Sequence, residues 1–455
     1  MRPYLADMAE NRKSVGRGMV LLTMCLAVLV AQVDTSVVNL AVRPIGADLH
    51  AEVAGLQWVV DAYNLTYAVL LLTGGLLADL YGRRLIFMAG VAVFTAASLL
   101  CAAAPGIAVL IGARALAGSG AALLVPASLA IIRVVWTDPA ERGRALGIWA
   151  SCNGVAFAIG PPLGGILIAH FGWRSVFLCV VPFGIAALVL AARAVPEAAD
   201  PHGRRFDPGG QALGAGALGA LALAAIEAQG RPWVSGAALA VCVVAFLGFR
   251  AVERRADAAA LVPLDLFGLA PFRGTMIATA AMTFGMYGVL FLVPLVWQSS
   301  GKLGPQGAGF ALLPMALIFA LVSPRSGKLT ERFGARAMIA GGLGAIGCGL
   351  LVLSAADGGA SLGIAELGLA LAGLGMGIAT GPLFAVAVAS VPSERSGTAS
   401  ALINVARMVG ATLGVAALGS AFALLHGGAD GLRAAMLAGG LVQLAGAATA
   451  WAIVR

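Results

Sequence analysis

The sequence predicts an all-α integral membrane protein with fourteen membrane-spanning helices, in which two bundles of six helices are separated by two inserted helices. Of its 455 residues, 60% are hydrophobic and 11% are charged, and the mean hydropathy is +0.96. Soluble proteins carry about 25% charged residues, and a soluble chain of this length could not bury so much apolar surface. The composition therefore indicates a lipid bilayer as the solvent. It excludes a disordered chain, a secreted disulfide scaffold and a nucleic-acid-binding protein.

Fourteen segments are apolar and long enough to cross a bilayer, which takes about 20 residues. They are 19–42, 55–78, 85–104, 107–132, 145–169, 174–195, 208–228, 233–250, 272–298, 307–324, 337–355, 361–388, 397–424 and 431–453. The first segment follows basic residues as a signal peptide would, but it is too long for one, and a second apolar segment follows almost at once. We therefore interpret it as the first span.

The distribution of basic residues predicts how the spans are oriented. An even number of spans places both termini on one side, and cytoplasmic loops are enriched in Lys and Arg. Most of the 29 Lys and Arg residues fall on the side of the termini, and the few on the other side are Arg43, Arg174, Arg231, Lys302 and Arg433. The sequence thus predicts a multi-pass protein of the inner (plasma) membrane with both termini in the cytoplasm. Its net charge of +8 is explained by topology and anionic lipid, without nucleic acid.

An internal repeat predicts the domain organisation. Five residues of one loop recur at a constant offset in a second loop: Gly75, Leu77, Asp79, Gly82 and Arg84 match Gly327, Leu329, Glu331, Gly334 and Arg336. Three glycines recur at nearly the same offset: Gly147, Gly160 and Gly164 match Gly397, Gly410 and Gly414. The offset exceeds half the chain, so we expect a six-helix bundle at 1–197, an inserted helix pair at 198–260 and a second six-helix bundle at 261–455. Parallel repeats of this kind are typical of transporters.

Four blocks of residues carry a resemblance to a known family. They are Asp34 to Ala41, Gly75 to Arg84, Arg114 to Ala122 and Gly160 to Gly165. At these blocks the sequence resembles the major facilitator superfamily, and most of all its fourteen-helix drug:proton antiporter family. It departs from the family pattern where Arg43 stands in place of Pro, Ala117 in place of Gln and Val180 in place of Asn.

The resemblance implies a fold and a function. The fold would be that of the superfamily, and the function would be proton-driven efflux of drugs or antibiotics by alternating access. The proton gradient would supply the energy without a cofactor, and the partners would be a small-molecule substrate, protons and membrane lipid around a monomer. A uniporter or a proton symporter for a small metabolite is the alternative. The later spans offer few acids for a dication, so small hydrophobic or singly charged compounds are the expected substrates.

Asp34, Asp61 and Arg114 lie inside predicted spans, where a charge costs on the order of 3 kcal/mol. Asp34 lies about 22 Å into its span and Arg114 about 10 Å into a span of opposite direction, at 1.5 Å per residue. Both therefore reach a similar depth, as does Asp61, so two acids and one base can neutralise one another. Our hypothesis is that Asp34 and Arg114 form the proton-coupling pair and that Asp61 is a second titratable or substrate-facing acid. The alternative is a static ion pair that fixes helix register.

Two of the resembling blocks predict moving contacts. In the loop with Gly75, Asp79, Gly82, Arg83 and Arg84, the resemblance implies that Asp79 accepts from the start of a helix in the opposite half and that the two arginines latch the cytoplasmic side. Marking of topology is the alternative role of these arginines.

The block with Gly160, Pro161, Gly164 and Gly165 resembles the antiporter motif of the superfamily. Its glycines admit close helix contact, and its prolines remove backbone donors. We expect either a seal against proton leak or an ordinary tight crossing.

Six further polar residues are candidates for a substrate cavity: Asn39, Tyr63, Asn64, Asn153, Asn404 and Arg407. Polar residues in membrane spans also join helices to one another, so about half of such a set is expected to be structural. Arg407 lies near the middle of its span, and it is expected to meet an anionic substrate group, a helix-end carbonyl or Asp61.

The sequence offers no catalytic or metal site. The four histidines, His50, His170, His202 and His426, fall in predicted loops and never pair with a carboxylate at metal or general-base spacing. No Gly-rich loop with Lys predicts nucleotide binding. The six cysteines show no C-x-x-C spacing, and they predict neither a disulfide framework nor a zinc site.

Overall fold

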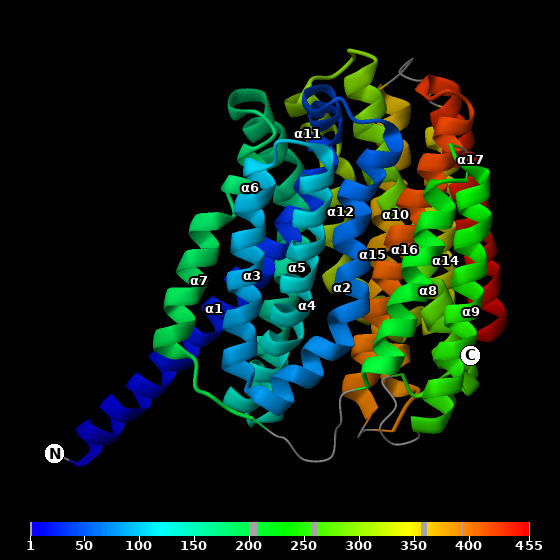
Figure 1. The fold of residues 1–455 in the computed structure, drawn as a ribbon. Coiled ribbons are helices and arrows are strands. Elements are labelled where there is room, and N and C mark those ends of the chain that lie inside the picture. Colours follow the sequence, from blue (N-terminus) through cyan, green and yellow to red (C-terminus); the bar gives the residue numbers. More distant parts are fainter. Residues whose placement is uncertain are drawn as a thin grey trace.

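The computed structural model describes residues 2–199, 207–228, 230–256, 262–355, 362–392 and 395–454, which are mostly helical (Figure 1). Within this part of the chain, fourteen helices are long and apolar enough to cross a membrane. Each of them overlaps one predicted span, so the number and order of the spans are confirmed.

The first half of the chain forms seven helices: α1 (Arg2–Leu49), α2 (Val53–Tyr81), α3 (Arg83–Ala103), α4 (Ile107–Val135), α5 (Pro139–Phe171), α6 (Ser175–Leu178) and α7 (Val181–Ala194). The inserted pair is α8 (Pro208–Ile226) and α9 (Pro232–Ala256). The remainder forms η2 (Leu264–Gly268), α10 (Ala270–Ser299), α11 (Pro305–Ala311), α12 (Leu313–Val322), η3 (Ser323–Arg325), α13 (Ser326–Phe333), α14 (Ala335–Ala355), α15 (Leu362–Ala389), α16 (Ser396–Leu424) and α17 (Gly428–Ile453).

Three predicted spans differ in detail from the observed helices. Helix α1 continues through Pro44 to Leu49. The predicted span ended at residue 42 because only the apolar run was counted, and the helix extends beyond that run. The predicted span 174–195 is divided into α6 and α7 just before Pro182, and the span 307–324 is interrupted beside Pro314 and Pro324. A proline has no backbone N–H and disrupts the preceding turn of a helix, which explains these interruptions.

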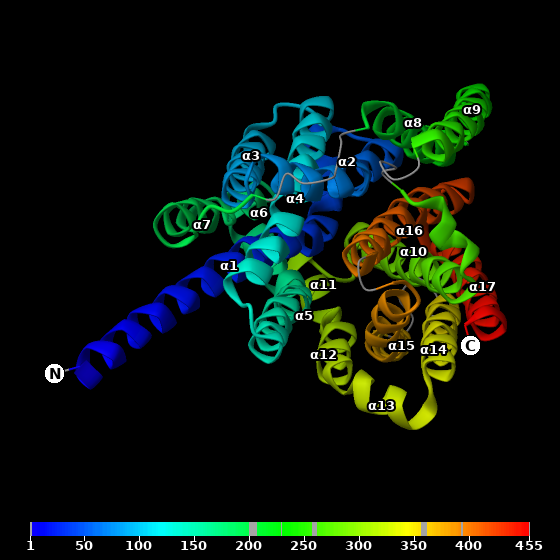
Figure 2. The ribbon, with the colours of Figure 1, turned by 90° about the horizontal axis from the view of Figure 1, so that it is seen from below.

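The helices form two groups, which we call the N-half (α1–α7) and the C-half (α10–α17). In the N-half α2 and α3 pack on α4, and α1 packs on α5; in the C-half α15 and α17 pack on α14, and α16 packs on α10. The halves meet where α2 contacts α16, where α5 contacts α11 and α12, and where α1 contacts α10. The pair α8–α9 lies at the edge of the molecule against α2 and α16 (Figure 2). Residues 200–206 and 257–261, which join this pair to the halves and hold the expected domain boundary at 260, lie outside the described residues.

The two halves repeat local backbone geometry. Gly82 ends α2 with φ +114° and Gly334 ends α13 with φ +82°. Each donates its N–H to the carbonyl four residues earlier, at 3.2 Å to Ala78 and 2.8 Å to Thr330. Glycine adopts positive φ without the steric cost that a Cβ brings, so the repeated loop conserves a helix stop.

The ends of the helices define two opposite faces of the molecule. The termini face is the side on which α2 ends at Tyr81 and α16 begins at Ser396. The distal face is the side on which α1 ends at Leu49 and α16 ends at Leu424.

Candidate functional site

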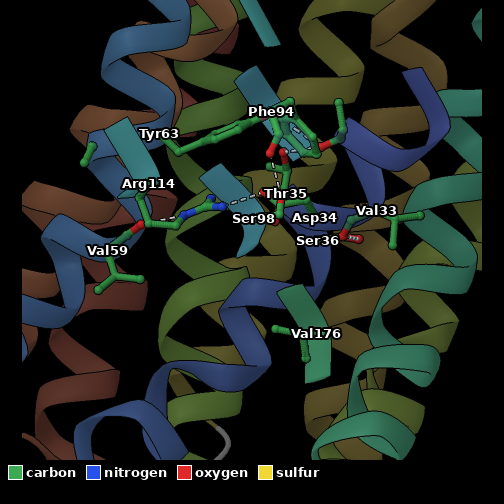
Figure 3. Close-up of polar contacts among 12 residues, drawn as sticks. Val33, Asp34, Thr35, Ser36, Val59, Tyr63, Phe94, Ser98, Arg114 and Val176 are labelled. Carbon is green, nitrogen blue, oxygen red and sulfur yellow. Dashed lines mark hydrogen bonds and ion pairs between the residues drawn. The ribbon is translucent and has the colours of Figure 1, made fainter. Parts of the chain in front are cut away.

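A buried ion pair joins α1 to α4 inside the N-half (Figure 3). Arg114 Nη1 lies 2.6 Å from Asp34 Oδ2, and each residue is 1% exposed. Arg114 also donates from Nε to the carbonyl of Val59 in α2, at 3.1 Å. The depth arithmetic from the sequence therefore placed these two charges at the right level, and the structure brings them into contact.

Aromatic rings enclose the guanidinium of Arg114. The ring centroid of Tyr63 lies 4.5 Å from its Cζ and that of Phe177 lies 5.8 Å away. Such stacking favours a cation, more so when the group is removed from water. The Tyr63 hydroxyl donates to the carbonyl of Ala31 at 3.4 Å. Tyr63, a candidate cavity residue, thus forms a wall of the ion pair.

Asp61 stands apart from the ion pair. It is fully buried (0% exposed), and neither carboxylate oxygen has a hydrogen-bond partner among the described residues. The expectation that one base neutralises both acids is wrong, because Arg114 contacts α2 at Val59. The Tyr63 side chain points to Arg114 of α4. Residues two positions apart lie on nearly opposite sides of an α-helix, which has 3.6 residues per turn, so Asp61 faces away from α4.

The asparagine candidates fall into two groups. Asn64 is fully buried with no partner for its amide among the described residues, and Asn39 leaves its Oδ1 without one. Asn153 is only partly buried and donates to Ala150 O of its own helix, and Asn404 donates to Ser400 O of its own helix. Unsatisfied buried amides cost free energy unless a ligand or water pairs with them, so Asn39 and Asn64 remain the stronger candidates for contact with water or substrate.

Arg407 pairs with a neighbouring amide. Its Nη1 lies 3.2 Å from Asn404 Oδ1, and its Nε is buried without a partner in the described chain. Arg407 therefore bonds within α16, and among the described residues it forms no ion pair with Asp61.

The glycines of the antiporter motif pack on two partners. A Cβ on Gly160 would overlap the Ser36 side chain of α1, and one on Gly164 would lie 2.7 Å from Val37. On the other side, a Cβ on Gly165 would lie 2.7 Å from the carbonyl oxygen of Pro305 in α11.

The crossing of α5 with α11 is equally tight from the other helix. A Cβ on Gly309 would overlap the carbonyl oxygen of Pro161. The motif thus lies at a seam between the halves, near the distal face, where two backbones touch without side chains between them.

The loop at Gly82 is held by contacts within the N-half. Arg83 Nη2 lies 3.0 Å from Asp79 Oδ1, and Arg84 donates to Ala192 O at the end of α7. Glu197, which sequence reasoning missed, accepts the backbone N–H groups of Arg84 and Leu85, each at 3.1 Å. A carboxylate at a helix N-terminus is favoured by the free N–H groups and the macrodipole.

Two residues of this loop, Gly75 and Asp79, are left to describe. Gly75 is in ordinary contact with Pro126 of α4. The expected contact of Asp79 with the start of a helix in the opposite half stays a prediction, because residues 393–394 before α16 lie outside the described chain.

The histidines and metal ligands can be placed for the described chain. His170 lies in the last turn of α5, so its assignment to a loop is wrong, whereas His50 and His426 lie in turns; His202 is outside the described residues. Across the described residues, no group of three or more His, Cys, Asp and Glu could hold a metal ion.

Sequence reasoning also missed two glutamines that join the halves. Gln57 of α2 donates to two carbonyls of α16, and Gln298 of α10 donates to Leu40 O of α1 at 3.0 Å. An amide inside an otherwise apolar span was the available signal.

The sequence and the fold are similar to those of known proteins. The sequence profile of the Major Facilitator Superfamily matches residues 24–415. The chain is 37% identical over 398 residues to the multidrug resistance protein Stp of Mycobacterium tuberculosis, covering 86% of this chain and 73% of that protein. It is 30% identical over 454 residues to a methylenomycin A resistance protein of Streptomyces coelicolor, covering 98% and 94%. Among solved structures, the POT family transporter PepTSo superposes with a TM-score of 0.72 at 14% identity, over 96% of this chain and 97% of that one.

Proposed function

This chain belongs to the Major Facilitator Superfamily, and we propose that it is a proton-driven efflux transporter that exports small hydrophobic or singly charged drugs. It is a multi-pass plasma membrane protein and a transporter, not an enzyme. Relatives that match most of its length carry the names of multidrug and antibiotic resistance proteins, which supports efflux.

The proposal includes an orientation and a division into domains. The termini face is assigned to the cytoplasm because most Lys and Arg residues lie at that face. The N-half is assigned to residues 1–197, the inserted pair to 198–260 and the C-half to 261–455, and the protein acts as a monomer. Drug then leaves at the distal face as the halves rock about a central site.

The observation that carries proton coupling is the enclosed Asp34–Arg114 pair. Inside a protein, a carboxylate is stabilised by an adjacent guanidinium and destabilised when that partner is withdrawn. A movement of α4 against α1 would withdraw it, because the two groups belong to different helices. Protonation of Asp34 would then be linked to the conformation of the N-half, so that proton binding and helix movement drive each other.

Asp61 supplies a second proton or substrate contact in this proposal. An ionised carboxylate without any partner is costly inside a membrane protein, so we propose that Asp61 carries a proton in this conformation. It exchanges that proton when the halves part and water or a cationic drug reaches α2. Asn64 lies one turn away on the same face and offers an amide to the same ligand.

Transport into everted membrane vesicles tests the function. A drug panel in an efflux-deficient host first identifies a compound against which the protein protects and Asp34→Asn does not. Everted vesicles should then accumulate that compound when their lumen is acidic, and nigericin should abolish the accumulation. Accumulation that persists after nigericin would indicate a uniporter, and accumulation driven by the opposite pH gradient would indicate a symporter. Either result would contradict antiport.

A further inference from the structure

Gln57 is one of the two glutamines that join the halves near the distal face, and it joins α2 to α16. Gln57 lies in the second turn of α2, and its Nε2 donates to Ala416 O at 2.9 Å and to Val415 O at 3.1 Å, both in α16. The side chain is 2% exposed. An amide nitrogen has two N–H donors, and both are used across the interface between the halves.

The acceptor site on α16 depends on a glycine. A Cβ on Gly419 would overlap Gln57 Nε2. The carbonyls of Val415 and Ala416 point along the helix toward this position, and each has a second lone pair in addition to the one used by the helix. The missing side chain therefore exposes two backbone acceptors that any other residue would cover.

The contact between α5 and α11, which also joins the halves near the distal face, is closed differently. The offset that relates Gly82 to Gly334 also relates Gln57 to Gly309, so these two residues hold equivalent positions in the repeat. Gly309 brings α11 directly against the Pro161 carbonyl of α5. The α5/α11 seam is thus closed by backbone contact, and the equivalent α2/α16 seam is closed by an amide with two hydrogen bonds.

We propose that Gln57 and Gly419 form a distal latch that sets the fraction of molecules in which the distal face is closed. This inference rests on the proposed alternating access. When α2 and α16 part, water replaces both hydrogen bonds, so the net stabilisation of the closed state is modest. An uncharged amide thereby holds the seam without the large cost of separating a buried ion pair, which suits a contact that must open in every cycle.

Cysteine labelling tests the latch. Thr412, one turn inward on α16, is 3% exposed, and Thr412→Cys in a background with the six native cysteines replaced reports opening of this seam. Intact cells are treated with a membrane-impermeant maleimide, without drug or an imposed proton gradient. We expect Gln57→Leu and Gly419→Ala each to accelerate labelling by roughly 5- to 30-fold, the factor that corresponds to loss of one or two hydrogen bonds.

The chain offers a matched control. Gln443 is also fully buried, donates to a backbone carbonyl (Ala281 O) and abuts a glycine (Gly285), but all of these residues belong to the C-half. Gln443→Leu and Gly285→Ala should leave the labelling rate unchanged. Equal acceleration by these controls would mean general loosening, and it would overturn the latch.

Unchanged labelling in both latch variants would also overturn it. Acceleration seen only in inside-out vesicles would support the latch but contradict the proposed orientation. Because the assay needs neither drug nor proton flux, failure of proton coupling leaves its outcome unaffected.

Discussion

The two halves of this protein repeat one fold but differ in what they bury. The N-half encloses Asp34, Asp61 and Arg114, each at most 1% exposed. In the described part of the C-half no charged residue is buried to that degree, and Arg407, which lies within a membrane-spanning helix, is only partly buried.

The glycine contacts, in contrast, are shared. Gly160 packs on Ser36 of α1, and its counterpart Gly410 packs on the Ala280 carbonyl of α10. Close crossings in both halves require a residue without a side chain, whereas the buried charges are found in the N-half. Under the proposed mechanism, the coupling chemistry would belong to the N-half, and the C-half would move against it.

The largest effect should follow from separating the buried pair. Arg114→Leu leaves the Asp34 carboxylate uncompensated and should lower the free energy of unfolding by about 3–5 kcal/mol. Adding Asp34→Asn removes the orphaned charge and should restore most of that stability without restoring transport. Thermal unfolding of the purified variants in detergent measures both. Equal stability of Arg114→Leu and wild type would mean that the pair is not enclosed as described.

The glycine crossing should give the next largest effect. Gly309→Ala inserts a methyl group against the Pro161 carbonyl, and overpacking of this kind costs about 1–3 kcal/mol. The cost falls on the state in which the α5/α11 seam is closed, so a cysteine at Ala308, which is 0% exposed, should label faster. Gly341→Ala is the matched control, because nothing lies near its Cβ position. Slower labelling of the Gly309→Ala protein would exclude a tight seam.

Replacement of Asp61 sharpens the comparison within the N-half. Asp61 has no ionic partner to lose, so Asp61→Asn should change stability by less than about 1 kcal/mol, in contrast to Arg114→Leu. Drug accumulation in everted vesicles should nevertheless fall. A large loss of stability would reveal a partner for Asp61, and full accumulation would remove it from the transport cycle.

The smallest effect is expected in the C-half. Arg407→Gln keeps an N–H donor next to Asn404 and should change the KM for drug by less than about tenfold, or ~1.4 kcal/mol. It should leave drug-induced proton release intact. Loss of proton release in the Arg407→Gln variant would contradict the proposed difference between the halves, because a residue of the C-half would then take part in proton coupling.

The sequence predicted the levels of residues in the membrane better than the directions in which they point. Fourteen apolar runs sufficed for the order of the helices, and depth arithmetic placed Asp34 beside Arg114. The same arithmetic grouped Asp61 with them, because it carries no information on which side of α2 a residue occupies. Arg407 was expected to meet an anionic substrate group, a helix-end carbonyl or Asp61. It donates instead to the Asn404 amide in its own helix, and its contact with a substrate stays a prediction.

The partners of two further residues could not be predicted. Gln57 and Glu197 act on partners far away in the chain, and nothing in their immediate sequence identifies those partners. The repeat did supply a usable hint for Gln57, because its counterpart is a glycine. The difference in residue type between the equivalent positions Gln57 and Gly309 shows where the α2/α16 and α5/α11 seams differ.

Proton release on drug binding tests the central claim most directly. Purified protein in weakly buffered detergent solution receives a saturating amount of the drug identified in the susceptibility panel, and the pH of the solution is recorded. If Asp34 carries the exchanged proton, wild type and Arg407→Gln release protons and Asp34→Asn releases none from this site. Equal release from Asp34→Asn and wild type would contradict the account.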